Sequence, residues 1–171
     1  MYRSVTLSAL AIAVFTTALW NSREPIRPPG IPGNAKPIDW LGELARLDPP
    51  PFDGGANADT EEDAELQFQA TMTFYRRGAY AMAIPGLREA LELDSRAVGA
   101  RFYLGICLLM TGELEEGEQV LEDTIAWGDT RYREPALLYG AKANLLLRRV
   151  ERAHAMLLET GMGLPERLMS H

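Results

Sequence analysis

The chain repeats itself at an interval of 34 residues, and this self-similarity constrains the fold more than any other feature. Residues 64–96 align with residues 98–129, so that Gly78 of the first copy falls on Gly112 of the second. A third copy follows at a slightly longer offset and has Arg148-Arg149 in place of the glycine. A fixed period of about 20–50 residues is typical of stacked arrays in which each repeat is one supersecondary unit.

The periodicity within each copy is helical. From Thr60 onward apolar residues recur at the spacing of one helix face, and no alternation of period two persists. Thr60 and the three acidic residues after it predict a helix start, with the threonine hydroxyl as the cap. Small residues at the predicted crossings allow two helix backbones to approach closely. These small residues are Ala83, Gly105, Gly117 and Ala153. We therefore expect an all-α fold.

The pattern resembles the tetratricopeptide repeat family over residues 64–160. The resemblance is carried by Leu104-Gly105 before Leu108, by Gly78-x-Tyr80-x-x-Ala83, and by the sequence ALELD at residues 90–94. Where the family has Leu-Gly, the first copy has Ala70-Thr71 and the third has Gly140-Ala141. The resemblance implies a right-handed superhelical solenoid of about three helical hairpins, which binds other proteins and carries out no catalysis.

Composition and periodicity together divide the chain into four parts. We expect a membrane anchor or signal segment at 1–22, a linker rich in proline and glycine at 23–59, a repeat domain at 60–161 and a C-terminal tail at 162–171. Within the linker, Trp40, Leu41, Leu44 and Leu47 predict a short amphipathic helix near 38–48. This apolar stripe would dock on the repeat domain or on a membrane surface. The repeats are expected at about 64–97, 98–131 and 134–161.

Residues 5–20 form an uncharged and mostly apolar run that indicates a membrane signal. The run is shorter than the ~20 residues of a spanning helix and lies near the upper limit for a signal peptide. Thr16-Thr17-Ala18 matches a cleavage site weakly, whereas Leu19 and Trp20 extend the run as an interfacial anchor would. An uncleaved anchor is favoured, and a secreted periplasmic protein after cleavage is the alternative.

Orientation and source rest on weaker signals. Arg3 lies on one side of the run and Arg23, Arg27 and Lys36 on the other, so the positive-inside rule does not decide the topology. The short N-terminal flank favours a single pass through a bacterial inner membrane, with the repeat domain in the periplasm. The order of membrane segment, proline-rich spacer and hairpins resembles bacterial envelope-linked tetratricopeptide proteins. No His-x-x-x-Cys-x-x-Cys motif is present, so a role with a sigma factor is not carried over.

The charge and the reactive residues exclude several functions. The net charge of −7, with no basic block beyond two arginine pairs, argues against nucleic acid as a partner. Cys107 is the single cysteine, and the two histidines, His154 and His171, lie far from it, so no metal site is expected. No nucleophile beside a base and no phosphate-binding loop is found, so we expect neither catalysis nor a cofactor. Cys107 is interpreted as a buried small apolar residue, and the acidic run at 113–118 as a solvated helix face.

What remains is a binding surface on the first helix of each hairpin. The resemblance implies that these helices line the concave side, where an apolar groove would bind a peptide or partner protein. Some of the groove residues are alternatively core between repeats. The predicted groove residues are Phe68, Met72, Tyr75, Arg76, Phe102, Ile106, Leu109, Met110, Leu138, Lys142 and Leu145.

A second hypothesis is self-assembly. The third copy is followed by no polar capping helix, because LPERLM at residues 164–169 is too short to cover its apolar face. Its exposed side would then pair with a second copy and make a homo-oligomeric structural or envelope protein.

Overall fold

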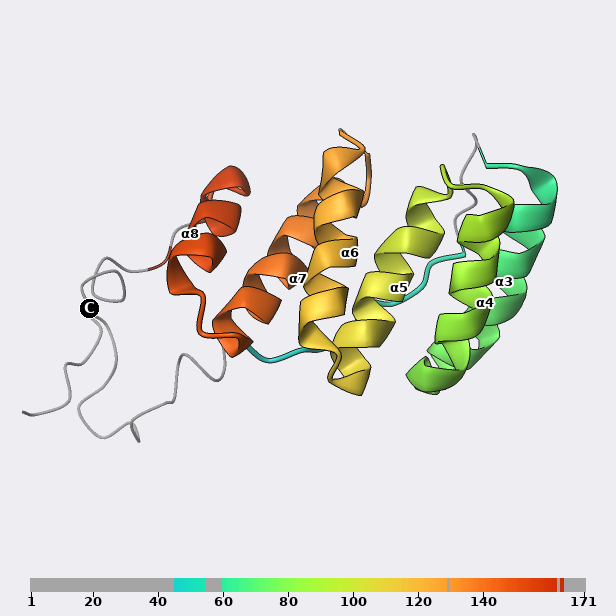
Figure 1. The fold of residues 1–171 in the computed structure, drawn as a ribbon, viewed down its shortest axis with the longest axis horizontal. Coiled ribbons are helices and arrows are strands. Elements are labelled where there is room, and N and C mark those ends of the chain that lie inside the picture. Colours follow the sequence, from blue (N-terminus) through green and yellow to red (C-terminus); the bar gives the residue numbers. More distant parts are fainter. Residues whose placement is uncertain (1–44, 55–59, 129, 163, 165–171) are drawn as a thin grey trace, which may run out of the picture. The chain divides into compact units, whose positions relative to one another are not determined.

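The computed structural model describes residues 45–54, 60–128, 130–162 and 164. Over these residues it contains six α-helices and no strand, which confirms the all-α class (Figure 1). None of these helices is long and apolar enough to cross a lipid bilayer. The predicted membrane segment at residues 5–20 lies outside the described residues. The helices are α3 (Glu62–Arg76), α4 (Tyr80–Leu93), α5 (Val98–Thr111), α6 (Leu114–Ala126), α7 (Arg133–Leu146) and α8 (Val150–Glu159).

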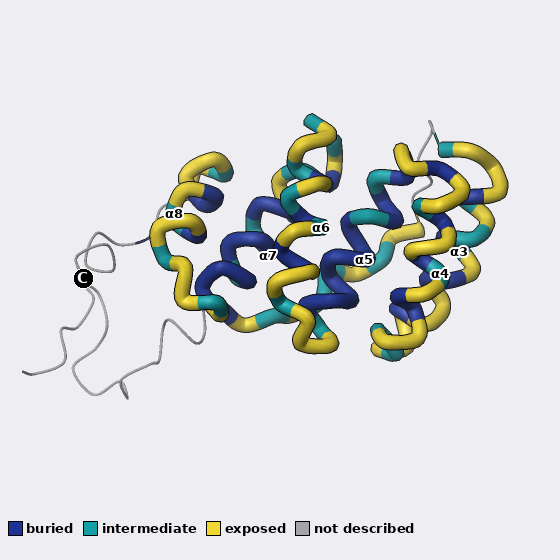
Figure 2. The backbone as a smooth tube through the Cα atoms, in the orientation of Figure 1, coloured by how far each residue is buried: buried dark blue, intermediate teal, exposed yellow. Residues whose placement is uncertain are grey.

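Each helix packs mainly against its neighbours in the sequence. The pairs α3–α4, α5–α6 and α7–α8 form hairpins, and the hairpins join directly through α4–α5 and α6–α7. Of the six helices, α5 and α7 contain the most buried residues, whereas α4, α6 and α8 turn one side to solvent (Figure 2). This arrangement fits the predicted helical solenoid.

The turn inside each hairpin has the same hydrogen-bonding pattern. In the first hairpin the Gly78 amide donates to Tyr75 O at 2.9 Å and the Ala79 amide to Phe74 O at 3.0 Å. The same two bonds recur around Gly112 in the second hairpin and around Arg148 in the third. This is the Schellman motif, which needs a left-handed residue. The φ angles are 73° at Gly78, 92° at Gly112 and 61° at Arg148, so an arginine adopts the conformation that favours glycine.

Two of the predicted small residues, Gly105 and Gly117, lie where helices cross. A Cβ atom added to Gly117 would lie 3.1 Å from the Gly105 carbonyl oxygen, so α5 and α6 touch backbone to backbone. In the first hairpin, Thr71 occupies the position of Gly105. A Cβ atom on Gly86 would collide with the Thr71 hydroxyl, so the glycine on α4 makes room for the threonine on α3.

The start of α3 differs from the prediction. The N-cap residue is Glu61 and no side chain caps the helix locally, so Thr60 does not have the predicted role. Instead, the buried Asp94 accepts a hydrogen bond from the Glu61 amide at 3.0 Å. Backbone amides of Arg96 and Glu61 both donate to this carboxylate, and they lower the pKa of Asp94. The cap comes from the loop between α4 and α5 because the hairpin fold brings that loop to the helix start.

Candidate functional site

Residues 45–54, here called the inner segment, run across the first helices of all three hairpins. The segment contains no helix, and it passes α7, α5 and α3 as the cyan trace of Figure 1. Residues 45–48, the described part of the helix predicted near 38–48, are a turn followed by chain without regular structure. The rest of that predicted helix lies outside the described residues. The side of α3, α5 and α7 that contacts the segment is called the inner face.

The inner face binds the segment mainly through its backbone carbonyl groups. The Tyr75 hydroxyl donates to Pro50 O at 2.6 Å, and the Tyr103 hydroxyl donates to Pro51 O at 3.2 Å. The Tyr139 hydroxyl donates to the carbonyl of Asp48. A fourth donor, Lys142 Nζ, lies 3.0 Å from Arg46 O. The donors come from all three helices, so the face recognises an extended main chain along its length.

One side chain of the segment, Phe52, is held by aromatic rings. It makes edge-to-face contacts with Phe68 on α3 and with Tyr103 on α5, with centroid distances of 5.5 Å to each. The guanidinium carbon of Arg76 lies 5.3 Å from the Phe52 ring centroid. Contacts of this kind contribute about 0.5–1.5 kcal/mol each beyond the buried area. Phe52 is therefore the main side-chain anchor of the segment.

A charge pair follows the aromatic anchor. The Asp53 carboxylate and Arg131 Nη2 are 2.9 Å apart. Both side chains are largely exposed, so the pair contributes at most about 1 kcal/mol. The pair helps to fix the register of the segment on the inner face. Asp53 can reach Arg131 only when the preceding residue, Phe52, lies at the aromatic contact.

The donating tyrosines are held in their neutral form. Tyr75 and Tyr103 are 5% and 3% exposed, and desolvation raises the pKa of each well above the usual value of 10.0. Burial also raises the pKa of Tyr139. At neutral pH all three hydroxyls therefore carry a proton that they can donate to a carbonyl group.

The predicted groove residues divide into core and surface. Four of them contact the inner segment in the interactions above, namely Phe68, Tyr75, Arg76 and Lys142. Whether any of the set binds a partner stays a prediction. The set is placed as follows: Phe68, Met72, Tyr75, Phe102, Ile106, Leu109 and Leu145 are buried, Met110, Leu138 and Lys142 are intermediate, and Arg76 is exposed.

Sequence reasoning missed Tyr103, Tyr139 and Arg131, and it treated the inner segment as a linker. A signal for the segment existed. Three consecutive prolines at 49–51, flanked by Leu47 and Phe52, favour an extended polyproline conformation whose carbonyls are free to accept hydrogen bonds. Aromatic-lined grooves recognise such segments. Leu47, which belongs to the stripe expected to dock, packs against the repeat core.

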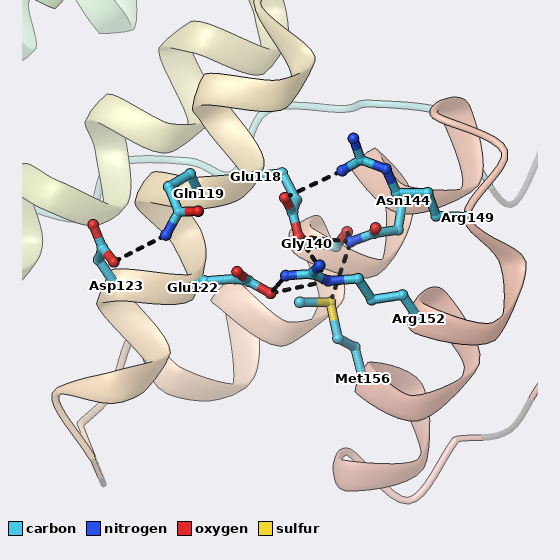
Figure 3. Close-up of polar contacts among 9 residues, drawn as sticks. All are labelled: Glu118, Gln119, Glu122, Asp123, Gly140, Asn144, Arg149, Arg152 and Met156. Carbon is cyan, nitrogen blue, oxygen red and sulfur yellow. Dashed lines mark hydrogen bonds and ion pairs between the residues drawn. The ribbon is translucent and has the colours of Figure 1, made fainter.

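A second polar cluster joins the last two hairpins (Figure 3). Glu118 on α6 was interpreted as part of a solvated acidic face, and this is wrong, because its side chain is only 5% exposed. Its carboxylate lies 3.2 Å from Arg152 Nε and 3.5 Å from Arg149 Nη1. It also accepts a hydrogen bond from buried Asn144 at 3.1 Å. These partners lie on α7, on α8 and in the turn between them, so the cluster fixes the third hairpin to the second.

The described residues include one cysteine thiol, that of Cys107. Cys107 is fully buried in α5, as predicted, and desolvation raises the pKa of its thiol to about 12. A thiol of this kind is protonated and unreactive at neutral pH. Within the described ranges, no group of three or more His, Cys, Asp or Glu side chains can hold a metal ion. The best-developed site in this part of the chain is the inner face with its bound segment.

Comparison with known proteins agrees with the architecture. Residues 74–145 match the family model described as tetratricopeptide repeat. No curated protein and no solved structure matches the chain significantly. The matched residues run from the end of α3 to the end of α7 and contain the second hairpin whole, with both of its glycines at the α5–α6 crossing. Residues 74–145 are therefore tetratricopeptide repeats.

Proposed function

We propose that this protein is a membrane-tethered, non-catalytic scaffold that binds a partner protein or peptide on its inner face. Tetratricopeptide repeats generally mediate interactions between proteins, and the family is a non-catalytic fold. The observation that carries the proposal is the row of tyrosine hydroxyls that donate to the carbonyls of residues 48, 50 and 51. Donors arranged in this way suit an extended peptide of any origin.

The best test asks whether a partner lies on this face in living cells. A photo-crosslinking amino acid is placed at Arg76 or at Lys142, which both contact the inner segment. The matched control position is Arg88 on α4, which pairs with Glu116 on α6 instead. We expect adducts of discrete mass from Arg76 and Lys142 and none from Arg88. Adducts from Arg88 alone, or only intrachain products at every position, contradict the proposal.

Aspartate substitutions at the predicted groove residues Phe102 and Met72 would not test this face. Phe102 is 2% exposed and Met72 is fully buried, so an aspartate at either position would disrupt the core rather than only the face. Crosslinking at exposed or half-exposed positions avoids this problem.

The tether is proposed from sequence alone. Its support is the apolar run at residues 5–20, and the proposed location is a bacterial inner membrane with the repeat domain in the periplasm. The mass of the protein isolated from a membrane fraction distinguishes an uncleaved anchor from a chain processed after Ala18. Protease added to intact spheroplasts tests the orientation, because a periplasmic repeat domain is then degraded.

Self-assembly is the second candidate function. It is favoured by exposed apolar side chains near the last described helix, since Leu158 and Met162 are 57% and 46% exposed. Part of that end is covered, because Leu164 is buried in the apolar cluster of α7 and α8. Light scattering of the chain in detergent separates the candidates. A mass of one copy per micelle across the accessible concentrations excludes self-assembly.

A further inference from the structure

The inner segment has the contacts of a bound ligand rather than those of a core element. Of its ten residues only Ala45 is buried, and the others are half-buried or exposed. The hairpins pack on one another directly through α4–α5 and α6–α7, so the segment is not what joins them. Its contacts are hydrogen bonds to carbonyl groups, the aromatic anchor Phe52, apolar packing of Ala45 and Leu47, and one exposed ion pair. An equivalent peptide from another molecule could make every one of them.

We propose that the inner face is a recognition site for an extended proline-aromatic-acidic peptide, and that the inner segment occupies it until a partner segment of the same chemistry displaces it. This inference rests on the proposed function and specifies its ligand. The occupant seated on the face defines the chemistry, and its key residues are Pro50, Pro51, Phe52 and Asp53.

The peptide class follows from the contacts. Prolines donate no hydrogen bond and are pre-set in an extended conformation, so little entropy is lost when their carbonyls bind Tyr75 and Tyr103. The next residue must be aromatic to fill the contact between Phe68 and Tyr103. A carboxylate must follow it to meet Arg131. The Asp48 side chain, in contrast, is exposed and paired within the segment to Arg46.

The tether makes the inner segment a strong competitor. Only residues 55–59 separate it from Thr60 at the start of the repeat domain. A short connection gives the segment an effective concentration on the order of millimolar at the face. A partner peptide must therefore compete with the tethered segment for the face. Its apparent affinity is its intrinsic affinity multiplied by the fraction of chains whose face is free. The segment thus sets a threshold for binding.

The test is the binding of a fluorescein-labelled peptide of sequence ARLDPPPFDG to the full chain in detergent micelles, measured by fluorescence anisotropy. The doubly substituted chain Phe52→Ala, Asp53→Asn weakens the segment and leaves the face intact. We expect it to bind the peptide at least tenfold more tightly than the wild-type chain does. Adding Tyr75→Phe and Tyr103→Phe to this variant should reduce the affinity again. A peptide with alanine in place of phenylalanine, added to the same variant, should bind weakly.

A second arm does not depend on substitutions in the segment. A protease site is inserted between residues 54 and 60 of the otherwise unsubstituted chain and is cut after the chain has folded. The cut removes the covalent connection and leaves every residue that contacts the inner face unchanged. We expect the cut chain to bind the peptide and the intact chain to resist it. Circular dichroism of each sample verifies that helicity is kept.

Three results overturn the inference. One is equal peptide affinity of the intact, cut and substituted chains, and another is no saturable binding by the cut chain while its helicity is retained. The third is the finding that the wild-type chain is a dimer and that the peptide dissociates it, because the segment of one copy would then occupy the face of the other. If the peptide fails but crosslinks still form from Arg76 and Lys142, the ligand class is wrong and the proposed function stands.

Discussion

Two polar regions of the repeat domain use hydrogen bonds in opposite ways. On the inner face, tyrosine hydroxyls meet backbone carbonyls of a segment whose own side chains are mostly half-buried or exposed. Between the last two hairpins, the buried carboxylate of Glu118 meets two arginines and Asn144. Every residue has a backbone carbonyl group, so many peptides can bind the tyrosine hydroxyls. A buried carboxylate, in contrast, needs donors at fixed positions to compensate for its lost hydration. The first arrangement suits an exchangeable ligand, and the second fixes one helix arrangement.

The largest expected effect is on the fixed region. Glu118→Ala removes a buried acceptor that connects α6 to Asn144 and Arg152, so we expect a loss of about 2–3 kcal/mol in the free energy of unfolding. Denaturant titration followed by circular dichroism measures it. Glu115→Ala, on the exposed side of the same helix, is the matched control and should change stability little. Equal stability of the two variants would contradict the assignment of Glu118 to a structural cluster.

A smaller loss is expected on the exchangeable side. Phe52→Ala deletes a half-buried ring that contacts Phe68 and Tyr103, so the free energy of unfolding should decrease by about 1–2 kcal/mol. Thermal unfolding checks this value, with the exposed Phe74→Ala as control. We also expect Phe52→Ala to increase binding of the labelled peptide and Glu118→Ala to leave it unchanged. A collapse of the helical signal in Phe52→Ala would instead place the segment in the core.

A gain in stability is expected at the turn of the third hairpin. Arg148 has φ 61° where the other hairpins have glycine, and a side chain in the left-handed region costs about 1 kcal/mol. Arg148→Gly should therefore raise the midpoint of thermal unfolding. Arg148→Ala keeps the strain and serves as the control, since it removes the guanidinium group alone. If the two variants behave alike, backbone strain is not the cause.

The smallest effect appears only in alkaline solution. Tyr75 and Tyr103 have folded-state pKa values above the 10.0 of the unfolded chain, because burial disfavours the phenolate. Their stabilising contribution is fully present below pH 10 and declines as the pH rises above it, because the unfolded chain then releases protons that the folded chain retains. Ultraviolet titration of tyrosinate should show late-ionising residues. Tyr103→Phe should remove one of them, and an unchanged titration curve would argue against its burial.

The sequence supported much of the fold because the fold is local and repeated. The glycines at 78 and 112 mark turns, and small residues at 105 and 117 mark a helix crossing, so a periodic pattern suffices to predict hairpins. The third turn was harder to recognise, because Arg148 adopts a conformation that its residue type rarely takes. The family resemblance indicated the first helix of each hairpin, and four of the residues named on that basis contact the inner segment.

The remaining site could not be predicted, because it depends on contacts between residues distant in sequence. Tyr139 and Asp48 are 91 positions apart, and Tyr103 and Pro51 are 52 apart. A single sequence contains no signal for such pairs. Glu118 was misinterpreted for the same reason, since its three partners lie beyond the next loop.

The repeat, the helical class and the glycines at the α5–α6 crossing could be inferred from the sequence, because they follow from spacing within about 34 residues. Which surface is occupied and which charge is buried follow from the packing of the hairpins in three dimensions. The occupied surface depends on how the three hairpins align their first helices against residues 45–54, and the buried charge depends on how the third hairpin packs on α6. The stacking of the hairpins thus converts an apparent linker into the occupant of the inner face, and one residue of an acidic run into a buried connection between hairpins.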